Sequence, residues 1–476
     1  MTELIQLSQA QTITVALAVF FTGFFAYKKY PFLEKYNISE LFVGVGFTFF
    51  VLYLLSFAIN FQFTADQEKK IIELTQAQTL IIAMGVFFIG TFIHGKYSLL
   101  KKYNIPEPVI GGIFASLVLS VIYLIFARSF IFDGELYDDL MMTFFATVGL
   151  SAKFSFFKKG GKNIFIFLFV AGLFLIIQNL MGVSVAKLFG LSPYIGLLAG
   201  SVTLSGGHAT GAVYAKLPAF AGIPQAGEIA FACATFGLVI GGIIGGPISQ
   251  LLIARHKLAP ENKVLDPDDA LRGHGFNEPE TVTARSIIQV LLGAFVAIYC
   301  GRFLSANLNP LLVEKWGPNA QIPSFILVLA VGVIITNLCD LTKKYQVHEQ
   351  STDLINATSL TLFLSIALMS LKLWDINLSK LAFPMMTIIA LQTVLMALYS
   401  YYVTFRALGR DYDAAVIAGG HCGFGLGATT TAVANIESVT NRYGAAPRAM
   451  FSILMVGAFF IDICNATVVQ IFMYFF

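Results

Sequence analysis

The sequence predicts an all-α polytopic membrane protein: two inverted five-span repeats, each with a re-entrant hairpin, plus an extra N-terminal two-span hairpin. Composition is the first observation that predicts this fold. Of the 476 residues, 57% are hydrophobic and 12% are charged, and the mean hydropathy is +0.78. Soluble domains carry about 25% charged residues, so this composition suits a bilayer. The other two observations are a series of long apolar runs and a pair of Gly-rich segments.

The apolar runs are long enough to cross a hydrocarbon core of about 30 Å as helices. We expect spans at 11–27, 41–61, 74–94, 107–127, 139–157, 163–189, 226–254, 285–305, 321–339, 353–371, 382–405 and 448–474. Two further segments, 194–216 and 414–436, are apolar but crowded with Gly, Ser, Thr and His. We expect these two segments to dip into the membrane and return.

The distribution of basic residues supports re-entrant loops. If both Gly-rich segments return to the side they came from, one set of loops holds most of the 30 Lys and Arg residues. The positive-inside rule makes that set cytoplasmic, which leaves both termini outside. If either segment crossed the membrane fully, every later loop would move to the opposite side. The difference in Lys and Arg content between the two sides would then be smaller.

Residues 1–73 are expected to form an additional N-terminal transmembrane hairpin, retained and not removed as a signal peptide. This hairpin looks like a duplicate of the next one. Gln9-Ala-Gln-Thr12 recurs as Gln76-Ala-Gln-Thr79, and Lys35-Tyr-Asn-Ile38 recurs as Lys102-Tyr-Asn-Ile105. An even number of added spans leaves the topology of the rest unchanged.

A fainter repeat divides the remaining chain. We expect 74–254 to be the first inverted repeat, with re-entrant loop 194–216, and 285–476 to be the second, with re-entrant loop 414–436. The polar segment 255–284 is the expected cytoplasmic linker. An odd number of crossings in each unit turns the second copy upside down. Inverted repeats place a transport site near the midplane, where broken helices meet.

The chemistry is predicted to lie in Ser201-Val-Thr-Leu-Ser-Gly-Gly-His-Ala-Thr-Gly211 and Gly419-Gly-His-Cys-Gly-Phe-Gly-Leu-Gly-Ala-Thr-Thr-Thr431. Non-helical backbone at membrane depth must find partners for its N–H and C=O groups. Free N–H groups at helix N-termini suit carboxylates, and freed carbonyls and hydroxyls suit a hard cation such as sodium. The alternative is that these glycines only let helices pack closely; two such segments in equivalent places favour a site.

Polar side chains in or near the apolar runs extend this site. Asp462 lies inside the last run with Asn465 close to one turn later, and an intramembrane carboxylate is functional by default. His208 and His421 are placed at or near the tips of the dips, either as proton or ligand groups or as residues that bond the loop backbone. Gln178 and Gln392 occupy comparable places in the two halves, as substrate contacts or as helix-joining residues.

We therefore predict two sets of site residues. The predicted substrate-binding residues are Ser205, Gly206, Gly207, His208, Thr210, Gly423, Gly425, Gly427, Thr429 and Asp462. The predicted sodium-binding residues are Ser201, Thr203, Thr430, Asp462 and Asn465. We expect no catalytic residues, no metal beyond sodium and no cofactor other than sodium as the coupling ion.

Several function classes are excluded or disfavoured. A net charge of +3 is too small to indicate nucleic acid as a partner, and the five cysteines lack metal-ligand or disulfide spacing. The chain has no HExxH or GxSxG motif and no soluble catalytic domain, so we do not expect an enzyme. No Lys or Arg lies securely inside a span, since those within the expected bounds, such as Lys187 and Arg302, are close to span ends. Helix ends, hydroxyls and cations must then hold an anionic substrate. Co-moving cations also offset the cost of about 2.3 kcal/mol per charge per 100 mV that an anion meets on entry.

Several motifs in order resemble those of the bacterial sodium:glutamate symporter family, also called the glutamate:sodium symporter (ESS) family. The motifs are Lys102-Tyr-Asn-Ile-Pro-Glu-Pro-Val109, Phe144-Phe-Ala-Thr-Val-Gly-Leu150, Leu197-Leu-Ala-Gly-Ser-Val-Thr-Leu-Ser-Gly-Gly-His208, Ala232-Cys-Ala-Thr-Phe-Gly-Leu-Val239, Gly245-Gly-Pro247, Asp411-Tyr-Asp-Ala-Ala-Val416, Gly420-His-Cys-Gly-Phe-Gly-Leu-Gly-Ala-Thr429 and Val456-Gly-Ala-Phe-Phe-Ile-Asp-Ile-Cys-Asn465. The resemblance runs from about residue 74 to the C-terminus, and residues 1–73 depart from the family pattern.

The resemblance implies sodium-coupled symport of L-glutamate across the bacterial inner membrane by alternating access, with an elevator-like movement and a homodimer. The nearest alternative is a sodium symporter for a 2-hydroxycarboxylate or another dicarboxylate. Asp462 disfavours it, because this carboxylate offers a place for an amino group, which hydroxy acids lack. An ion channel is a further alternative, but inverted halves are typical of alternating access within one chain.

Overall fold

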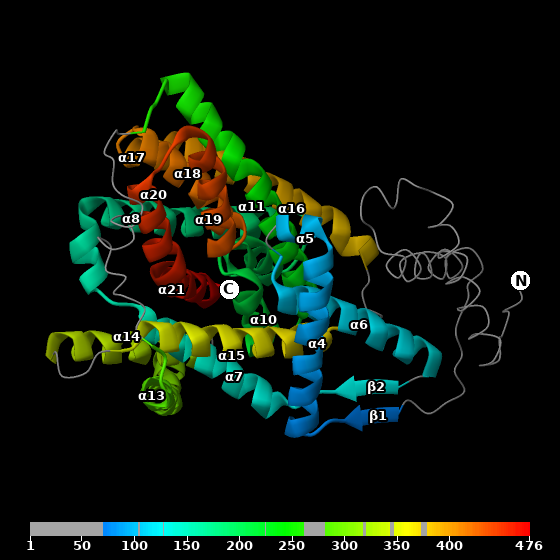
Figure 1. Ribbon diagram of the computed structural model, residues 1–476. Helices are drawn as coiled ribbons and strands as arrows, with labels where there is room; N and C mark the ends of the chain where they lie inside the picture. The colour runs from blue at the N-terminus through cyan, green and yellow to red at the C-terminus, as the bar shows by residue number, and fades with distance from the viewer. Residues whose placement is uncertain are drawn as a thin grey trace, which may run out of the picture. The chain divides into compact units, whose positions relative to one another are not determined.

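The computed structural model describes residues 70–102, 105–126, 128–223, 225–260, 281–317, 320–342, 347–372 and 378–476 (Figure 1). Residues 1–69 of the expected N-terminal hairpin and residues 261–280, most of the expected linker, lie outside these ranges. The described chain separates into two compact units. The smaller unit contains residues 106–133, the described residues up to Lys102, and 368–372; the larger contains nearly all the rest.

In the smaller unit, two strands and two long helices follow the sequence pattern closely. The elements are β1 (Lys70–Glu73), α4 (Gln76–Lys96), α5 (Ser98–Lys102), α6 (Glu107–Phe126) and β2 (Arg128–Ile131). The strands pair in parallel, so the expectation of an all-α chain is wrong for these two short segments. Thr75 begins α4 with a capping box, in which its hydroxyl and the Gln78 side chain bond each other's backbone N–H.

The first element of the larger unit is α7 (Gly134–Ser151), and all the elements in its described residues are helices. It continues with α8 (Ser155–Leu188), α9 (Pro193–Leu197), the π-helix η1 (Leu198–Val202), α10 (Gly207–Tyr214), the 3₁₀ turn η2 (Pro218–Phe220) and α11 (Ala226–His256). Then follow α13 (Ala284–Trp316), α14 (Ser324–Thr342), α15 (Glu349–Met369), α16 (Leu378–Tyr399), the π-helix η5 (Ser400–Thr404) and α17 (Phe405–Ala407). The last elements are α18 (Tyr412–Leu426), α19 (Thr429–Tyr443), α20 (Pro447–Met455), the π-helix η6 (Val456–Phe460) and α21 (Ile461–Tyr474).

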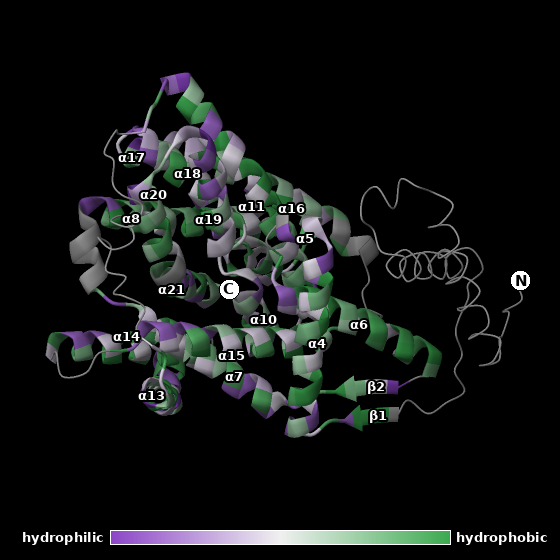
Figure 2. Ribbon diagram, in the orientation of Figure 1, coloured by the Kyte–Doolittle hydropathy of each residue, from purple (hydrophilic) through white to green (hydrophobic). Residues whose placement is uncertain are grey.

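Within the described ranges, 8 helices are long and apolar enough to cross a membrane. They are Gln76–Lys96, Glu107–Phe126, Lys162–Leu188, Ala226–His256, Ala284–Trp316, Ser324–Thr342, Glu349–Met369 and Phe383–Ala407. Figure 2 shows hydrophobic residues along most of α6 and α11. Large apolar side chains such as Leu292 and Tyr299 on α13 are mostly exposed, as expected for a face that meets lipid. The chain is therefore a multi-pass membrane protein.

Small residues allow helices in the larger unit to approach closely. Gly237, Gly241, Gly245 and Ser249 recur every fourth residue on one face of α11, against α18. A methyl group on Gly241 would lie 3.0 Å from the Cys422 carbonyl oxygen, and the Ser249 hydroxyl donates to the Ala415 carbonyl over 2.8 Å. Such small-residue stripes drive helix association in membranes, where apolar burial alone gives no preference. They hold α18 in place against α11.

A small residue also allows close packing between α13 and α14. A methyl group on Gly301 would lie 2.6 Å from the Cα atom of Val328. On the neighbouring pair, the Thr336 hydroxyl of α14 donates to the Leu150 carbonyl of α7 over 2.6 Å. These close backbone contacts make α7, α13 and α14 one packed group.

Both Gly-rich segments are helices interrupted by a break. At each break, backbone N–H and C=O groups lie in the interior without partners in the helix. The first runs through α9, η1 and α10, with non-helical backbone at Gly200 and a positive φ of 68° at Gly207. The second is a helical hairpin, because Gly423 of α18 meets Ala432 of α19 across the break at 427–428. Whether these segments return to the side they came from stays a prediction.

Candidate functional site

The break in the first Gly-rich segment leaves a helix N-terminus without a cap. Gly207 has left-handed backbone, which glycine adopts without the steric cost of a side chain, and it starts α10. The N-cap residue is Gly206, and no side chain bonds the first turn. The first N–H groups of a helix have no partner within the helix. The N-terminus of α10 is thus open to an acceptor.

The second break repeats this arrangement. Helix α18 ends at Leu426, Gly427 and Ala428 are extended or irregular, and α19 starts at Thr429. Ala428 is the N-cap of α19, and its methyl group offers no cap. A second helix N-terminus therefore lies in the interior without a side-chain acceptor.

The two breaks lie against each other. A methyl group on Gly207 would lie 3.6 Å from the Gly427 carbonyl oxygen. Two residues away on each side, the Ser205 hydroxyl is 3.2 Å from the Gly425 carbonyl oxygen. Helix N-termini attract anions through free N–H groups and the partial positive charge of the helix dipole. Two such termini side by side form a place for a solute with more than one negatively charged group.

Two amide side chains contact Ser201, which directly follows the non-helical residue Gly200. The Ser201 N–H donates to Asn179 Oδ1 over 2.9 Å, and Asn465 Nδ2 donates to the Ser201 carbonyl over 3.0 Å. Among the described residues, Ser201 Oγ and Asn465 Oδ1 are buried without a hydrogen-bond partner. Buried polar atoms are almost always paired. Two neighbouring oxygens without a donor fit a small cation, whose ligands are oxygen atoms.

The last broken helix adds a carboxylate and a carbonyl to this region. Asp462 lies in the first turn of α21, directly after η6, and Asn465 follows three residues later on the same face. Asp462 is half-buried. At the other end, the Thr429 hydroxyl at the start of α19 donates to the Gly457 carbonyl of η6 over 2.7 Å. A π-helix often marks a functional site, and this one contacts the second break.

Other predicted site residues have different contacts. Thr203 is buried and its hydroxyl donates to the Leu198 carbonyl over 2.5 Å, whereas Thr430 is exposed and so is not buried with Ser201. Thr210 is buried and packs against Gly206. A methyl group on Gly206 would lie 2.7 Å from the Thr210 Cβ atom. Gly423 serves helix packing, because a methyl group there would lie 2.5 Å from Ala432.

The two histidines occupy different environments, contrary to their expected placement at similar tips. His208 lies at the break, in the first turn of α10, and its Nε2 is 3.1 Å from the Thr235 hydroxyl of α11. His421 lies within α18, six residues before the break at Gly427. Its Nδ1 is 2.9 Å from the Thr404 hydroxyl, and four aromatic rings pack around it: Phe167, Phe174, Tyr399 and Phe424. Each ring therefore lies within hydrogen-bond distance of a hydroxyl side chain.

Residues 178 and 179 on α8 are two candidate site residues that the sequence pattern alone underweights. The pattern favours Gln178 as a residue that joins helices over a substrate contact, and it does not point to Asn179. Both are fully buried, and both bond the segment from Ser201 to Ser205. The available signal was two consecutive amide side chains in an otherwise apolar run.

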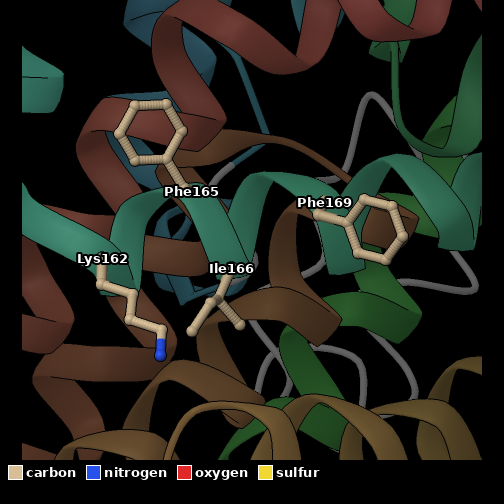
Figure 3. A pocket seen from close by; sticks show the side chains of 4 residues that line it. All are labelled: Lys162, Phe165, Ile166 and Phe169. Carbon is tan, nitrogen blue, oxygen red and sulfur yellow. The ribbon is translucent and has the colours of Figure 1, made fainter.

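A shallow groove on the outer face of α8 is not part of this site. It is lined by Lys162, Phe165, Ile166 and Phe169 (Figure 3). Phe165 and Phe169 are 56% and 72% exposed, which is typical of a surface that meets lipid. With one ammonium group and three apolar side chains, the groove lacks the polar groups that a charged solute needs.

Comparison with known proteins identifies the family. The family model described as "Sodium/glutamate symporter" matches residues 72–445. A sodium/glutamate symporter of Haemophilus influenzae is 42% identical over 397 residues, covering 83% of this chain and 96% of that protein. Sodium/glutamate symporters of Escherichia coli K12 and Shigella flexneri are each 43% identical over 399 residues, with the same coverage.

A solved structure of a sodium proton antiporter from Methanocaldococcus jannaschii aligns with 83% of this chain and 97% of that chain. Its TM-score is 0.36 and its identity is 12%, too low to define a shared fold. The family match and the curated relatives are decisive. This chain belongs to the sodium/glutamate symporter family.

Proposed function

We propose that this protein carries L-glutamate into the cell together with sodium ions, by alternating access with an elevator-like movement, across the bacterial inner membrane. The family match and the relatives, which are sodium/glutamate symporters, support the substrate and the coupling ion. The chain's own geometry supports the binding of an anionic solute.

The observation that carries this proposal is the pair of uncapped helix N-termini at Gly207 and Thr429, whose breaks lie side by side. Glutamate has two carboxylates, and each N-terminus offers free N–H groups to one. The Ser205 and Thr429 hydroxyls lie at the same breaks. The Asp462 carboxylate is the proposed partner of the ammonium group.

Sodium is proposed to bind next to this place. Ser201 Oγ and Asn465 Oδ1 are the first ligands, because both are buried oxygens that no group in the described chain donates to. Asp462 adds a negative charge one turn from Asn465. Thr203 and Thr430 remain secondary candidates. A bound cation beside a bound anion stabilises both, since opposite charges attract strongly where water is excluded.

The proposed architecture is two inverted halves, each of five spans and one re-entrant hairpin. Pro106 directly precedes α6, and Pro323 directly precedes α14, so the second long helix of each proposed half begins directly after a proline. We also propose that both termini face outside, that the segment around 255–284 is a cytoplasmic linker, and that the protein is a homodimer. The hairpin of residues 1–73 is proposed to belong to the dimer scaffold.

The direct test is uptake of radiolabelled L-glutamate into proteoliposomes, with and without an inward sodium gradient. Unlabelled L-glutamate, D-glutamate, L-aspartate and citrate serve as competitors. We expect sodium-dependent accumulation that glutamate blocks and citrate does not. Movement of citrate or malate in place of glutamate would keep the architecture and reject the substrate.

The Asp462→Asn variant tests the site within the same assay. It should lower the affinity for sodium or for glutamate, because the variant removes the one carboxylate of the proposed site. Unchanged transport at limiting sodium would remove Asp462 from the site. Thr467→Val, a change on the exposed side of the same helix, is the control.

A further inference from the structure

We infer that Gln178 is a positioning residue that couples the proposed sodium site at Ser201 to the proposed glutamate site at the second break. This inference rests on the proposed function. It starts from the end of α18, where the helix stops at Leu426 and leaves its last carbonyls without partners in the helix. One of these is the Gly425 carbonyl.

Gln178 supplies the missing partner from another helix. Its Nε2 donates to the Gly425 carbonyl over 2.9 Å, so a side chain of α8 caps the C-terminus of α18. Its Oε1 accepts from the Ser205 hydroxyl over 2.8 Å. Both ends of one buried amide are thus used, and each end holds a different broken segment.

The Ser205 hydroxyl can donate its hydrogen bond in either of two directions. It has one proton and two acceptors within reach, Gln178 Oε1 at 2.8 Å and the Gly425 carbonyl at 3.2 Å. A small movement of the backbone at Ser205 would therefore exchange one acceptor for the other. Hydrogen bonds of this kind are strong in a water-free interior, so each arrangement is well defined.

The neighbouring residue connects the same helix to the proposed sodium site. Asn179 Oδ1 accepts from the Ser201 N–H over 2.9 Å, so residues 178 and 179 hold the two ends of the stretch from Ser201 to Ser205. Cation binding at Ser201 acts on this stretch, which passes the change to Ser205 and, through Gln178, to Gly425. Gly425 lies two residues before the break that faces Gly207. Coupling between sites is carried by such contiguous networks.

Gln392 is the matched control. It is as fully buried as Gln178, and its Nε2 donates to the Gln178 backbone carbonyl over 2.8 Å. That carbonyl remains whatever side chain occupies position 178, and Gln392 Oε1 is buried without a hydrogen-bond partner among the described residues. Gln178→Met and Gln392→Met both replace an amide by an unbranched side chain of similar length. Loss of packing or of a buried hydrogen bond should therefore affect the two variants to a similar degree.

The experiment measures the apparent KM for glutamate in proteoliposomes at limiting and at saturating sodium. Their ratio reports the coupling between the two ligands, which for binding is typically 5- to 150-fold in coupled systems. We expect the unmodified protein and Gln392→Met to have similar ratios of KM at limiting sodium to KM at saturating sodium. Gln178→Met should lower the ratio at least fivefold, and the smaller change Ser205→Ala should lower it partly.

Each of the following outcomes would overturn the inference. A Gln178→Met ratio equal to that of the unmodified protein would mean that this amide does not couple the sites. A KM that rises by the same factor at both sodium concentrations would mean a uniform contact, and an equal loss in Gln392→Met would mean a general packing effect. If Gln178→Met does not fold, an unchanged ratio in Ser205→Ala is the rejecting result. Uptake that is independent of sodium in the unmodified protein would instead reject the proposed function itself.

Discussion

The Asn465 side chain donates a 3.0 Å hydrogen bond to the Ser201 carbonyl and so joins the last helix to the first broken segment. The other end of the same amide, Oδ1, is buried without a donor among the described residues. One side chain thus fixes the shape of the break and offers an oxygen beside it. Loss of this side chain should therefore affect both the break and the response to sodium.

Asn465→Leu should raise the sodium concentration for half-maximal glutamate uptake at least tenfold. A hydrogen bond or ligand contact to a charged group contributes about 1.5–3 kcal/mol, and 1.4 kcal/mol corresponds to a factor of ten. Sodium titration of uptake in proteoliposomes measures this shift. Asn307→Leu on α13, where the amide is exposed and bonds its own helix at Phe303, should leave the sodium response unchanged. A normal sodium response in Asn465→Leu would contradict the assignment.

Gly207→Ala should abolish or strongly reduce transport, and Gly190→Ala should not. The two glycines have nearly the same left-handed backbone, with φ of 68° and 69°. Either alanine should destabilise the protein by about 1–2 kcal/mol, because L-residues are strained there. Only Gly207 faces the second break, whereas a methyl group on Gly190 meets nothing within 4 Å. Thermal unfolding together with uptake separates the two effects, and equal uptake in both variants would speak against a site at the break.

Gly301→Ala should lower the thermal stability of the purified protein, while Gly293→Ala should leave it unchanged or raise it. Both glycines lie in α13, where alanine favours the helix by about 1 kcal/mol. A methyl group on Gly301 would overlap the Val328 backbone, with the amide nitrogen at 2.7 Å, and overpacking costs about 1–3 kcal/mol. On Gly293 it would meet only the end of Leu150, at 3.4 Å. A stability gain for Gly301→Ala would mean that α14 is free to move away.

Asp411→Ala should destabilise the protein by about 1 kcal/mol, and Asp411→Asn by less. The Asp411 carboxylate caps α18 by accepting from the Ala414 N–H over 2.8 Å, and loss of such a cap costs about 0.5–2 kcal/mol. It also pairs with Arg448 over 2.5 Å, but that pair is partly exposed, and exposed pairs contribute little. Asparagine keeps the cap and loses only the charge. Thermal unfolding of both variants ranks the two contributions, and equal losses would assign the effect to the ion pair.

The positions of most long helices follow from the sequence, because apolar run length dictates them. Two expected spans differ: the run at 139–157 corresponds to the more polar α7 (Gly134–Ser151), and the run at 448–474 is divided into α20, η6 and α21. Neither is among the 8 described helices that are long and apolar enough to cross a membrane. The runs expected at 107–127 and 226–254 correspond to α6 and α11 with ends shifted by two residues at most. The small parallel strand pair was not expected, since its two short segments are separated by α4, α5 and α6, and their pairing depends on contacts that no local pattern records.

The breaks were harder to place. The sequence Gly-Gly-His occurs in both segments, and it suggests that both histidines lie near a turn. In the first segment it does form the turn. In the second it stays helical, because Gly419 packs against Gly245 of α11 and Gly420 against Ile453 of α20, and the break occurs at Gly427. The partner helix decides which glycine bends the chain, and the partner is invisible in a single sequence.

The recognition of Ser201 and Ser205 by two adjacent amides of α8 was equally hidden. Gln178 and Asn179 are ordinary helix residues until the fold brings Ser201, Ser205 and Gly425 to them. Sequence reasoning found the glycines and hydroxyls of the breaks, whose backbone chemistry is local. It undervalued the side chains that hold these breaks, whose role exists only in the packed structure.

The uncapped N-termini of α10 and α19 have a consequence for how the protein responds to acidity and to mutation. Peptide N–H groups carry no titratable proton in the physiological range, so an anion held by them meets the same positive field at pH 5 as at pH 8. Acidification would then act through the solute or through carboxylates such as Asp462. Replacing side chains by alanine also leaves peptide groups in place, so an alanine scan would pass over the proposed anion contacts. Added bulk at the glycines, not removal of functional groups, is the change that reveals them.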